Sequence, residues 1–164
     1  MTFREAELVL FTADLAGYAR ATAHMPPLEV AELLEGWYRE LDAVIGRRGG
    51  RVVKYMGDGC LATFPTDRCL AAAEAATQLL DHRSATGLEI RVGVRIHLGI
   101  VAEGEVEVGA DRRYDVFGSA VNDLFRMGGA RSVLIIEPVY HRLPEDQRGS
   151  WHKHHVPAVY AWAR

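Results

Sequence analysis

Two aspartates stand where apolar residues give way to glycine. Asp14 ends the run ELVLFTAD shortly before Gly17, and Asp58 lies between Gly57 and Gly59. An apolar run is typical of a buried strand and Asp-Gly of a hairpin turn, so we expect both carboxylates at strand ends. We expect the first and second strands to lie side by side in one sheet, which would bring the two carboxylates together. Convergent carboxylates with open positions are the ligands that Mg²⁺ prefers. The structural alternative stays open: Asp14 would cap the next helix and Asp58 would be an ordinary turn residue.

A second polar group lies in the stretch RRYDVFGSAVNDLFR, residues 112–126. Asn122 and Arg126 are four residues apart, which places both on one face of a short helix expected at residues 118–128. An arginine can hold a phosphate through two hydrogen bonds, and an asparagine can hold a sugar hydroxyl. The alternative is an exposed polar face in which these side chains pair with Asp123 or Glu137.

The elements that must position these residues follow from hydrophobic periodicity and turn residues. Strand, helix, hairpin, helix and strand follow one another in the order of a ferredoxin-like βαββαβ core, within one α+β domain over residues 1–164 with extra C-terminal strands. That order leaves one face of the sheet without helices, and we expect a second copy to cover it. The expected elements are strands at 7–14, 51–56, 60–64 and 88–99, helices at 27–46, 66–82 and 118–128, and later strands at 132–137 and 158–163.

Composition excludes several classes of protein. The 164 residues are 49% hydrophobic and 25% charged with a net charge of −3, which describes a globular domain and not a basic nucleic-acid-binding protein. Two cysteines, Cys60 and Cys69, exclude a disulfide scaffold and fit a reducing compartment. No apolar run reaches the roughly 18 residues of a membrane span, and the first residues do not read as a signal peptide. We therefore expect a cytoplasmic protein with no nucleic-acid or membrane partner.

Four motifs together resemble the catalytic domain of class III adenylate/guanylate cyclases. They are FTADLAGY, GGRVVKYMGDGCLATF, RVGVRIHLG and YDVFGSAVNDLFR, and their order and spacing match over nearly the whole chain. The resemblance implies a cyclase (palm-like) fold in which Asp14 and Asp58 bind two Mg²⁺ or Mn²⁺ ions. It also implies that Asn122 orients the ribose and that Arg126 stabilises charge on the α-phosphate.

The same resemblance places Lys54 and Asp115 where the family reads the purine base. The pair is similar to the adenine-selecting combination, which implies ATP as the substrate and cyclic AMP and pyrophosphate as the products. Hydrogen bonding agrees, because a lysine can donate to adenine N1 and an aspartate can accept from the N6 amino group, whereas guanine has the opposite polarity. Lys54 is one of only two lysines among 19 basic residues, which weakens the alternative that its identity is incidental.

The other lysine, Lys153, lies in WHKHHVPAVY, which resembles the final hairpin of the family. The resemblance implies that Lys153 contacts the triphosphate, and the neighbouring His154 is the alternative. The histidines of this segment also leave a transition-metal site open as a different interpretation.

In this family, the metal aspartates of one site and its base-reading residues come from two chains packed head to tail. This chain carries both sets, so the resemblance implies a homodimer with two equivalent sites. No sensor segment is visible in the sequence, which implies a regulatory domain or protein acting in trans, or a longer protein of which this is the catalytic part.

Three departures from the family pattern leave alternatives open. Asp123, Leu124 and Phe125 are larger or charged where small residues are usual and could tilt the helix, Tyr18-Ala19 replaces Phe-Thr, and the last hairpin lacks a Lys-Gly pair. A weak or inactive cyclase-homology module that binds nucleotide or a signalling partner is therefore one alternative, and a guanylate cyclase is another. A diguanylate cyclase is excluded, because Gly49-Gly50 is followed by Arg51-Val52.

Overall fold

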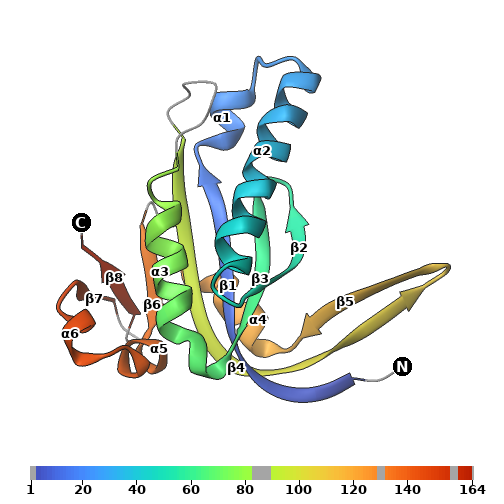
Figure 1. Ribbon diagram of the computed structural model, residues 1–164. Helices are drawn as coiled ribbons and strands as arrows, with labels where there is room; N and C mark the ends of the chain where they lie inside the picture. Colours follow the sequence, from blue (N-terminus) through green and yellow to red (C-terminus); the bar gives the residue numbers. More distant parts are fainter. Residues whose placement is uncertain (1–2, 83–89, 129–131, 156–158, 164) are drawn as a thin grey trace.

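The computed structural model describes residues 3–82, 90–128, 132–155 and 159–163. Their strands form one sheet in the order β2-β3-β1-β4-β6-β8-β7, and β5 pairs with β4 as the second strand of a long hairpin (Figure 1). The strands are β1 (Phe3–Ala16), β2 (Arg51–Met56), β3 (Gly59–Pro65), β4 (Arg91–Val108), β5 (Asp111–Phe117), β6 (Val133–Ile136), β7 (Trp151–His155) and β8 (Val159–Trp162). The helices are α1 (Tyr18–Thr22), α2 (Pro27–Gly46), the 3₁₀ turn η1 (Thr66–Arg68), α3 (Cys69–Leu79), α4 (Ser119–Arg126), α5 (Glu137–Arg142) and α6 (Glu145–Arg148).

The first four strands have the ferredoxin-like arrangement predicted from the sequence. β1 lies between β3 and β4 and is antiparallel to both, with Ala13 opposite Cys60 and Asp14 opposite Gly93. We had expected β2, the first strand of the hairpin, to be the neighbour of β1. The neighbour is instead β3, the second strand of the hairpin. Asp58 still lies near Asp14, because β3 begins directly after the hairpin turn.

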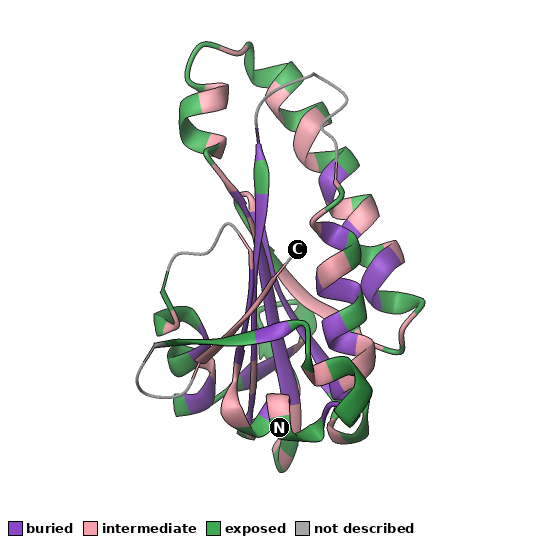
Figure 2. Ribbon diagram, turned by 90° about the vertical axis from the view of Figure 1, so that its left-hand side faces the viewer, coloured by how far each residue is buried: buried purple, intermediate pink, exposed green. Residues whose placement is uncertain are grey.

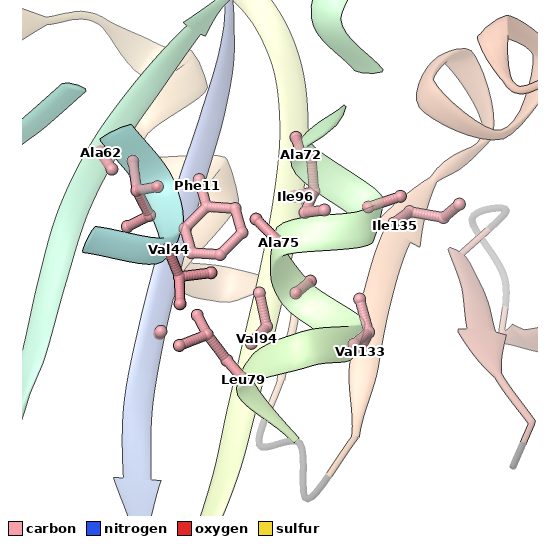
Figure 3. Packing of buried hydrophobic residues seen from close by; sticks show 14 of the residues in the cluster. Phe11, Val44, Ala62, Ala72, Ala75, Leu79, Val94, Ile96, Val133 and Ile135 are labelled. Atoms are coloured by element: carbon pink, nitrogen blue, oxygen red, sulfur yellow. The ribbon is translucent and has the colours of Figure 1, made fainter. Parts of the chain in front are cut away.

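α2 and α3 pack side by side on one face of the sheet and enclose the larger hydrophobic core. Figure 3 shows Phe11 of β1 beside Val44 of α2 and Ala75 of α3. All three side chains are buried, with at most 1% of each residue exposed. Figure 2 shows the same division along the whole molecule, with buried residues on the central strands and on the helix sides that face them.

α4 covers part of the opposite face, where the sequence had led us to expect no helix. Ala120 and Leu124 of α4 pack with Leu10 in a second, smaller core. Gly99 permits this close approach, because a Cβ at that position would lie 2.5 Å from the Ala120 Cβ. Asn122 lies on the exposed side of the same helix. α4 thus packs its apolar side against the sheet and presents its polar side chains to solvent.

The other predicted elements are found with shifted ends. The second long helix, α3, begins at Cys69 and not at residue 66, because Thr66–Arg68 form the 3₁₀ turn η1, in which the Thr66 hydroxyl donates to the Glu7 carbonyl oxygen. The predicted fourth strand continues to Val108 and forms a hairpin with β5, and neither β5 nor α6 was predicted. Positions 88 and 89 of the predicted fourth strand lie outside the described residues.

Within the described ranges, no helix is both long enough and apolar enough to cross a bilayer.

Candidate active site

Asp14 and Asp58 come together at the end of β1, as the sequence predicts. Asp58 lies on the β2–β3 turn, and its Oδ2 accepts a hydrogen bond at 3.3 Å from the amide of Leu15, the residue after Asp14. Gly59 makes the approach possible, because a Cβ there would lie 2.8 Å from the Ala13 carbonyl oxygen and 3.5 Å from the Asp14 Cβ. The Asp14 side chain is 33% exposed, so the pair of carboxylates is open to solvent.

Two aromatic residues of α2 hold the turn that carries Asp58. The indole Nε1 of Trp37 donates to the Asp58 carbonyl oxygen at 3.0 Å, and the Tyr38 hydroxyl donates to the Gly57 carbonyl oxygen. Trp37 is 1% exposed, and the ring of Tyr38 stacks on Tyr55 with the centroids 4.2 Å apart. The turn is therefore fixed from outside the hairpin. Trp37 was not identified from the sequence as a residue that positions this turn.

Arg95 is a further charged residue at the same end of β1. Its Nη1 donates to Asp14 Oδ2 at 2.7 Å, and its Nε donates to the carbonyl oxygen of Gly128, just beyond α4. The residue is 9% exposed. We did not identify Arg95 from the sequence, although a charged residue between Val94 and Ile96 in an apolar strand was a signal for it.

The donor set at Asp14 and Asp58 fits a divalent cation. Two carboxylates supply hard oxygen ligands, which suit Mg²⁺ and Mn²⁺, and Asp14 already binds a positively charged group. Within the part of the chain that is described, no group of three or more histidine, cysteine, aspartate or glutamate side chains is placed to hold an ion. Two protein carboxylates with remaining positions for water or phosphate oxygens is the arrangement that Mg²⁺ commonly takes with nucleotide substrates.

The described side chains alone do not make up the transition-metal site that is the other interpretation of the histidines in the last hairpin. His152 and His154 lie on β7 and are exposed, whereas the side chain of His155 is outside the described residues. That interpretation therefore stays a prediction.

Lys54 and Asp115, which lie 61 positions apart in the sequence, form an ion pair between β2 and β5. The Nζ atom of Lys54 donates to both carboxylate oxygens of Asp115, at 2.8 and 2.9 Å. Asp115 is 3% exposed, and its Oδ1 also accepts from the Val116 amide at 2.8 Å. The Lys54 side chain is 38% exposed. The carboxylate is thus fixed in the interior, while the ammonium group of the pair is reachable from solvent.

Asn122 and Arg126 both lie on α4, as predicted, and both are exposed, which is the surface that the structural alternative expected. The Arg126 side chain is 79% exposed, and its Nη1 lies 3.9 Å from Asp123 Oδ1. The expected alternative, pairing with Asp123, is therefore present as a loose surface contact. α4 continues through Leu124 and Phe125 without a break, so the departures from the family pattern at these positions do not interrupt the helix.

Lys153 lies apart from the other predicted site residues in the strand order of the sheet. It lies on β7, which ends the strand order on the side opposite to β2 and Lys54. Its side chain is exposed. The structure therefore leaves Lys153 as the predicted residue with the least geometric support.

Solved structures of nucleotide cyclase domains share this fold. A dimeric guanylyl cyclase domain of the RhoGC fusion protein from the aquatic fungus Blastocladiella emersonii matches with a TM-score of 0.81 at 20% identity, over 99% of this chain and 97% of that chain. The adenylyl cyclase CyaB from P. aeruginosa matches with a TM-score of 0.79 at 17% identity, over 100% of this chain and 97% of that chain. The fold class is thus that of nucleotide cyclase catalytic domains.

Sequence comparison identifies the family. Residues 4–154 match the family described as adenylate and guanylate cyclase catalytic domain, and the chain belongs to this family. An adenylate cyclase of Anabaena cylindrica is 33% identical over an alignment 155 residues long, which covers 83% of this chain and 30% of that protein. Retinal guanylyl cyclase 1 of Rattus norvegicus is 30% identical over an alignment 133 residues long, which covers 74% of this chain and 12% of that protein. The chain spans less than a third of the length of either relative.

Proposed function

We propose that this chain is the catalytic domain of an adenylate cyclase, which converts ATP into 3′,5′-cyclic AMP and pyrophosphate. The observation that carries the proposal is the ion pair between Lys54 and the buried Asp115, at 2.8 Å. In the reaction, the ribose 3′-oxygen bonds to the α-phosphorus, the bond to the pyrophosphate oxygen breaks, and the 3′-hydroxyl proton is released. Family membership supports the reaction class, and the pair supports adenine as the base.

Adenine recognition follows from the donors and acceptors that the pair still offers. A lysine ammonium has three N–H donors, and Lys54 directs two of them to Asp115, so the third can donate to adenine N1. A carboxylate accepts about four hydrogen bonds, and Asp115 receives three, from Lys54 and the Val116 amide. One acceptor position therefore suits the N6 amino group. Guanine presents O6 and N1–H at the same edge, which would place like groups against each other.

Residues of α4 are proposed to act on the sugar and the phosphate. Asn122 would hold the ribose so that its 3′-hydroxyl faces the α-phosphorus. Arg126 would place its guanidinium where negative charge develops on the α-phosphate oxygens, as a preorganised cation does in other phosphoryl-transfer sites. Lys153 of the last hairpin, or the neighbouring His154, is proposed to contact the triphosphate.

Asp14 and Asp58 are proposed to hold two Mg²⁺ or Mn²⁺ ions. Bound there, such ions would neutralise triphosphate charge and lower the pKa of the ribose 3′-hydroxyl. The contribution of the chain is to keep the two carboxylates beside each other at the end of β1. Trp37 and Tyr38 serve this purpose by fixing the turn that carries Asp58.

The proposed active form is a head-to-tail homodimer with two equivalent sites. Each site would take Asp14 and Asp58 from one chain and Lys54, Asp115, Asn122 and Arg126 from the other. The exposure of Arg126, at 79% of its side chain, agrees with a residue that meets its ligand at a boundary between chains. A regulatory domain or partner acting in trans would then control how the two chains pack.

Product identification tests the proposed function. The purified chain is incubated with Mn²⁺ and either ATP or GTP, and the products are separated by chromatography. We expect cyclic AMP from ATP, with at least about a tenfold preference over GTP, because each correctly paired base edge contributes about 1–3 kcal/mol of discrimination. The variant Asp58→Asn is the control and should form neither product. Cyclic GMP as the main product would support a guanylate cyclase, and no product from either nucleotide would support an inactive nucleotide-binding module.

Exchanging the base-reading pair tests the specificity assignment separately. Lys54→Glu combined with Asp115→Cys reverses the hydrogen-bonding polarity and should shift the ratio of kcat/KM for ATP and GTP towards GTP by about 10- to 100-fold. Arg113→Gln is the matched control, because Arg113 lies exposed on the same strand as Asp115 and the substitution lowers the net charge by one, as the double variant does. An unchanged ratio in the double variant would place base recognition elsewhere.

A further inference from the structure

Arg95 is the one basic residue among the buried polar residues of the described chain, and it binds a carboxylate that we propose as a metal ligand. Its Nη1 lies 2.7 Å from Asp14 Oδ2, and its side chain is 11% exposed. Its Nε donates to the Gly128 carbonyl oxygen, which fixes the guanidinium from a second side. Arg95 is therefore held between β1 and the segment that follows α4.

The register of β1 and β4 explains why Arg95 reaches Asp14. The residue directly opposite Asp14 is Gly93, which has no side chain to fill the space. Arg95 stands two residues further along β4, opposite Thr12, so it is the diagonal neighbour of Asp14 on the same face of the sheet. A long side chain at that position can cross the space beside Gly93 to the carboxylate.

A guanidinium and a divalent cation compete for the same carboxylate oxygen. The hydrogen bond from Arg95 to Asp14 joins two charged groups, which makes it stronger than a neutral one. The positive charge also repels any second cation beside Asp14, and burial reduces the screening of this repulsion by water. A metal ion that binds Asp14 must therefore displace the guanidinium from Oδ2 or bind against its charge.

We infer that Arg95 is an internal counterion that competes with the metal for Asp14 and so sets the metal affinity of the site. The inference rests on the proposed function, since it takes Asp14 and Asp58 as the metal ligands. In the chain without nucleotide, Arg95 keeps the carboxylate neutralised and divalent ions bind weakly. The triphosphate of a nucleotide brings negative charge that offsets the guanidinium, so the site favours metal that arrives together with its substrate.

Mn²⁺ titration of the full chain without nucleotide tests this inference. Free Mn²⁺ is followed by its electron paramagnetic resonance signal, which is lost on binding. Arg95→Gln should lower the Kd for Mn²⁺ by about tenfold or more, because the competing charge is removed while a side chain that can donate a hydrogen bond remains. Arg91→Gln is the matched control, since Arg91 lies on the same strand, has the same charge and is exposed to solvent. Its Kd should stay within about threefold of the wild type.

Aspartate variants separate the inference from the proposed function. Adding Asp14→Asn to Arg95→Gln should abolish the gain in affinity. If Arg95→Gln leaves the Kd unchanged or raises it, while Asp14→Asn still abolishes binding, the inference is wrong and the metal site stands. If neither Asp14→Asn nor Asp58→Asn affects Mn²⁺ binding, both the inference and the proposed function are wrong.

A second neutral variant covers the case in which Arg95→Gln does not fold, as judged by circular dichroism. Arg95→Met has a similar length and is also uncharged. Removing one member of an ion pair is costly where the other charge stays buried, but the Asp14 side chain is 33% exposed, so water can solvate its carboxylate. The same decrease in Kd is expected, and an unchanged Kd would again contradict the inference.

Discussion

The proposed base-reading pair, Lys54 and Asp115, and the exposed residues of α4 differ in how far one chain fixes their side chains. Asp115 is 3% exposed and receives hydrogen bonds from Lys54 and from the backbone, so its position is fixed in the folded chain. The Arg126 side chain, in contrast, is 79% exposed, and its Nη1 lies 3.9 Å from Asp123 Oδ1. Under the proposed function, the difference teaches that the preference for a base is built into the fold of one chain, whereas the phosphate contact is completed by the substrate. Substitutions at the two places should therefore change different quantities.

The largest effect is expected on turnover, from the exposed helix. Arg126→Ala should lower kcat by about 10² to 10³, because it removes a cation that acts in the transition state. The free energy of unfolding should change by less than about 0.5 kcal/mol, since an exposed side chain contributes little to stability. Turnover assays with ATP and Mn²⁺ and urea denaturation measure the two quantities.

Arg39→Ala is the matched control for this variant. Arg39 is also an exposed helical arginine with an acidic neighbour on its own helix, Glu35, and 77% of its side chain is accessible. It should change neither quantity. A large loss of stability in Arg126→Ala, or an unchanged kcat, would remove the contrast between the two regions.

A smaller effect, on stability, is expected from the base-reading pair. Lys54→Met leaves the buried Asp115 carboxylate without its ammonium group and should lower the free energy of unfolding by about 1–3 kcal/mol. Because Lys54 is 38% exposed, water replaces part of the lost contact, which favours the lower end of this range. Lys153→Met is the control, as Lys153 is exposed. If the two lysine variants were equally stable in urea, the pair would not be part of the folded framework.

The smallest effect is expected from His97, which lies on β4 in the second core region beneath α4. Burial lowers the pKa of His97, and its Nδ1 has no hydrogen-bond acceptor or donor among the described residues. The unfolded chain therefore takes up this proton first as the pH falls below about 6.5, and this uptake lowers the stability of the fold. At higher pH both states are neutral at this group, and the contribution disappears.

His97→Gln removes this titration and should make the decrease in unfolding free energy between pH 7.5 and pH 5 shallower. Urea denaturation at both values measures the slope. His24→Gln, at an exposed position, should keep the slope of the wild type. An unchanged slope in His97→Gln would mean that the ring is already protonated, or equally accessible, in the folded chain.

Sequence patterns predicted those features that depend on local order. Asp14 at a strand end and Asp58 on a hairpin turn follow from an apolar run and an Asp-Gly pair, and the spacing of Asn122 and Arg126 predicts their common helix face. The ferredoxin-like core was likewise predictable, because it follows from the order of the elements along the chain.

Features that depend on register or on packing between distant elements were not predictable in this way. The bond from Arg95 to Asp14 requires that Gly93 stand opposite Asp14, and the bond from Trp37 to the Asp58 carbonyl requires the observed position of α2. The pairing of Lys54 with Asp115 joins residues 61 positions apart, and only the family resemblance indicated it. α4 on the second face also depends on packing, through the close contact that Gly99 permits.

Complementation between two inactive variants tests the shared site most directly. Asp14→Ala removes a metal ligand and Asn122→Ala removes the ribose contact, so each homodimer lacks one function in both sites. In a mixed dimer, one site combines the intact Asp14 of one chain with the intact Asn122 of the other. The second site contains both substitutions. Equal mixing should therefore restore about a quarter of the wild-type activity, since half of the dimers are mixed and each has one working site. No activity above that of the separate variants, with both shown to dimerise, would contradict a site built from two chains.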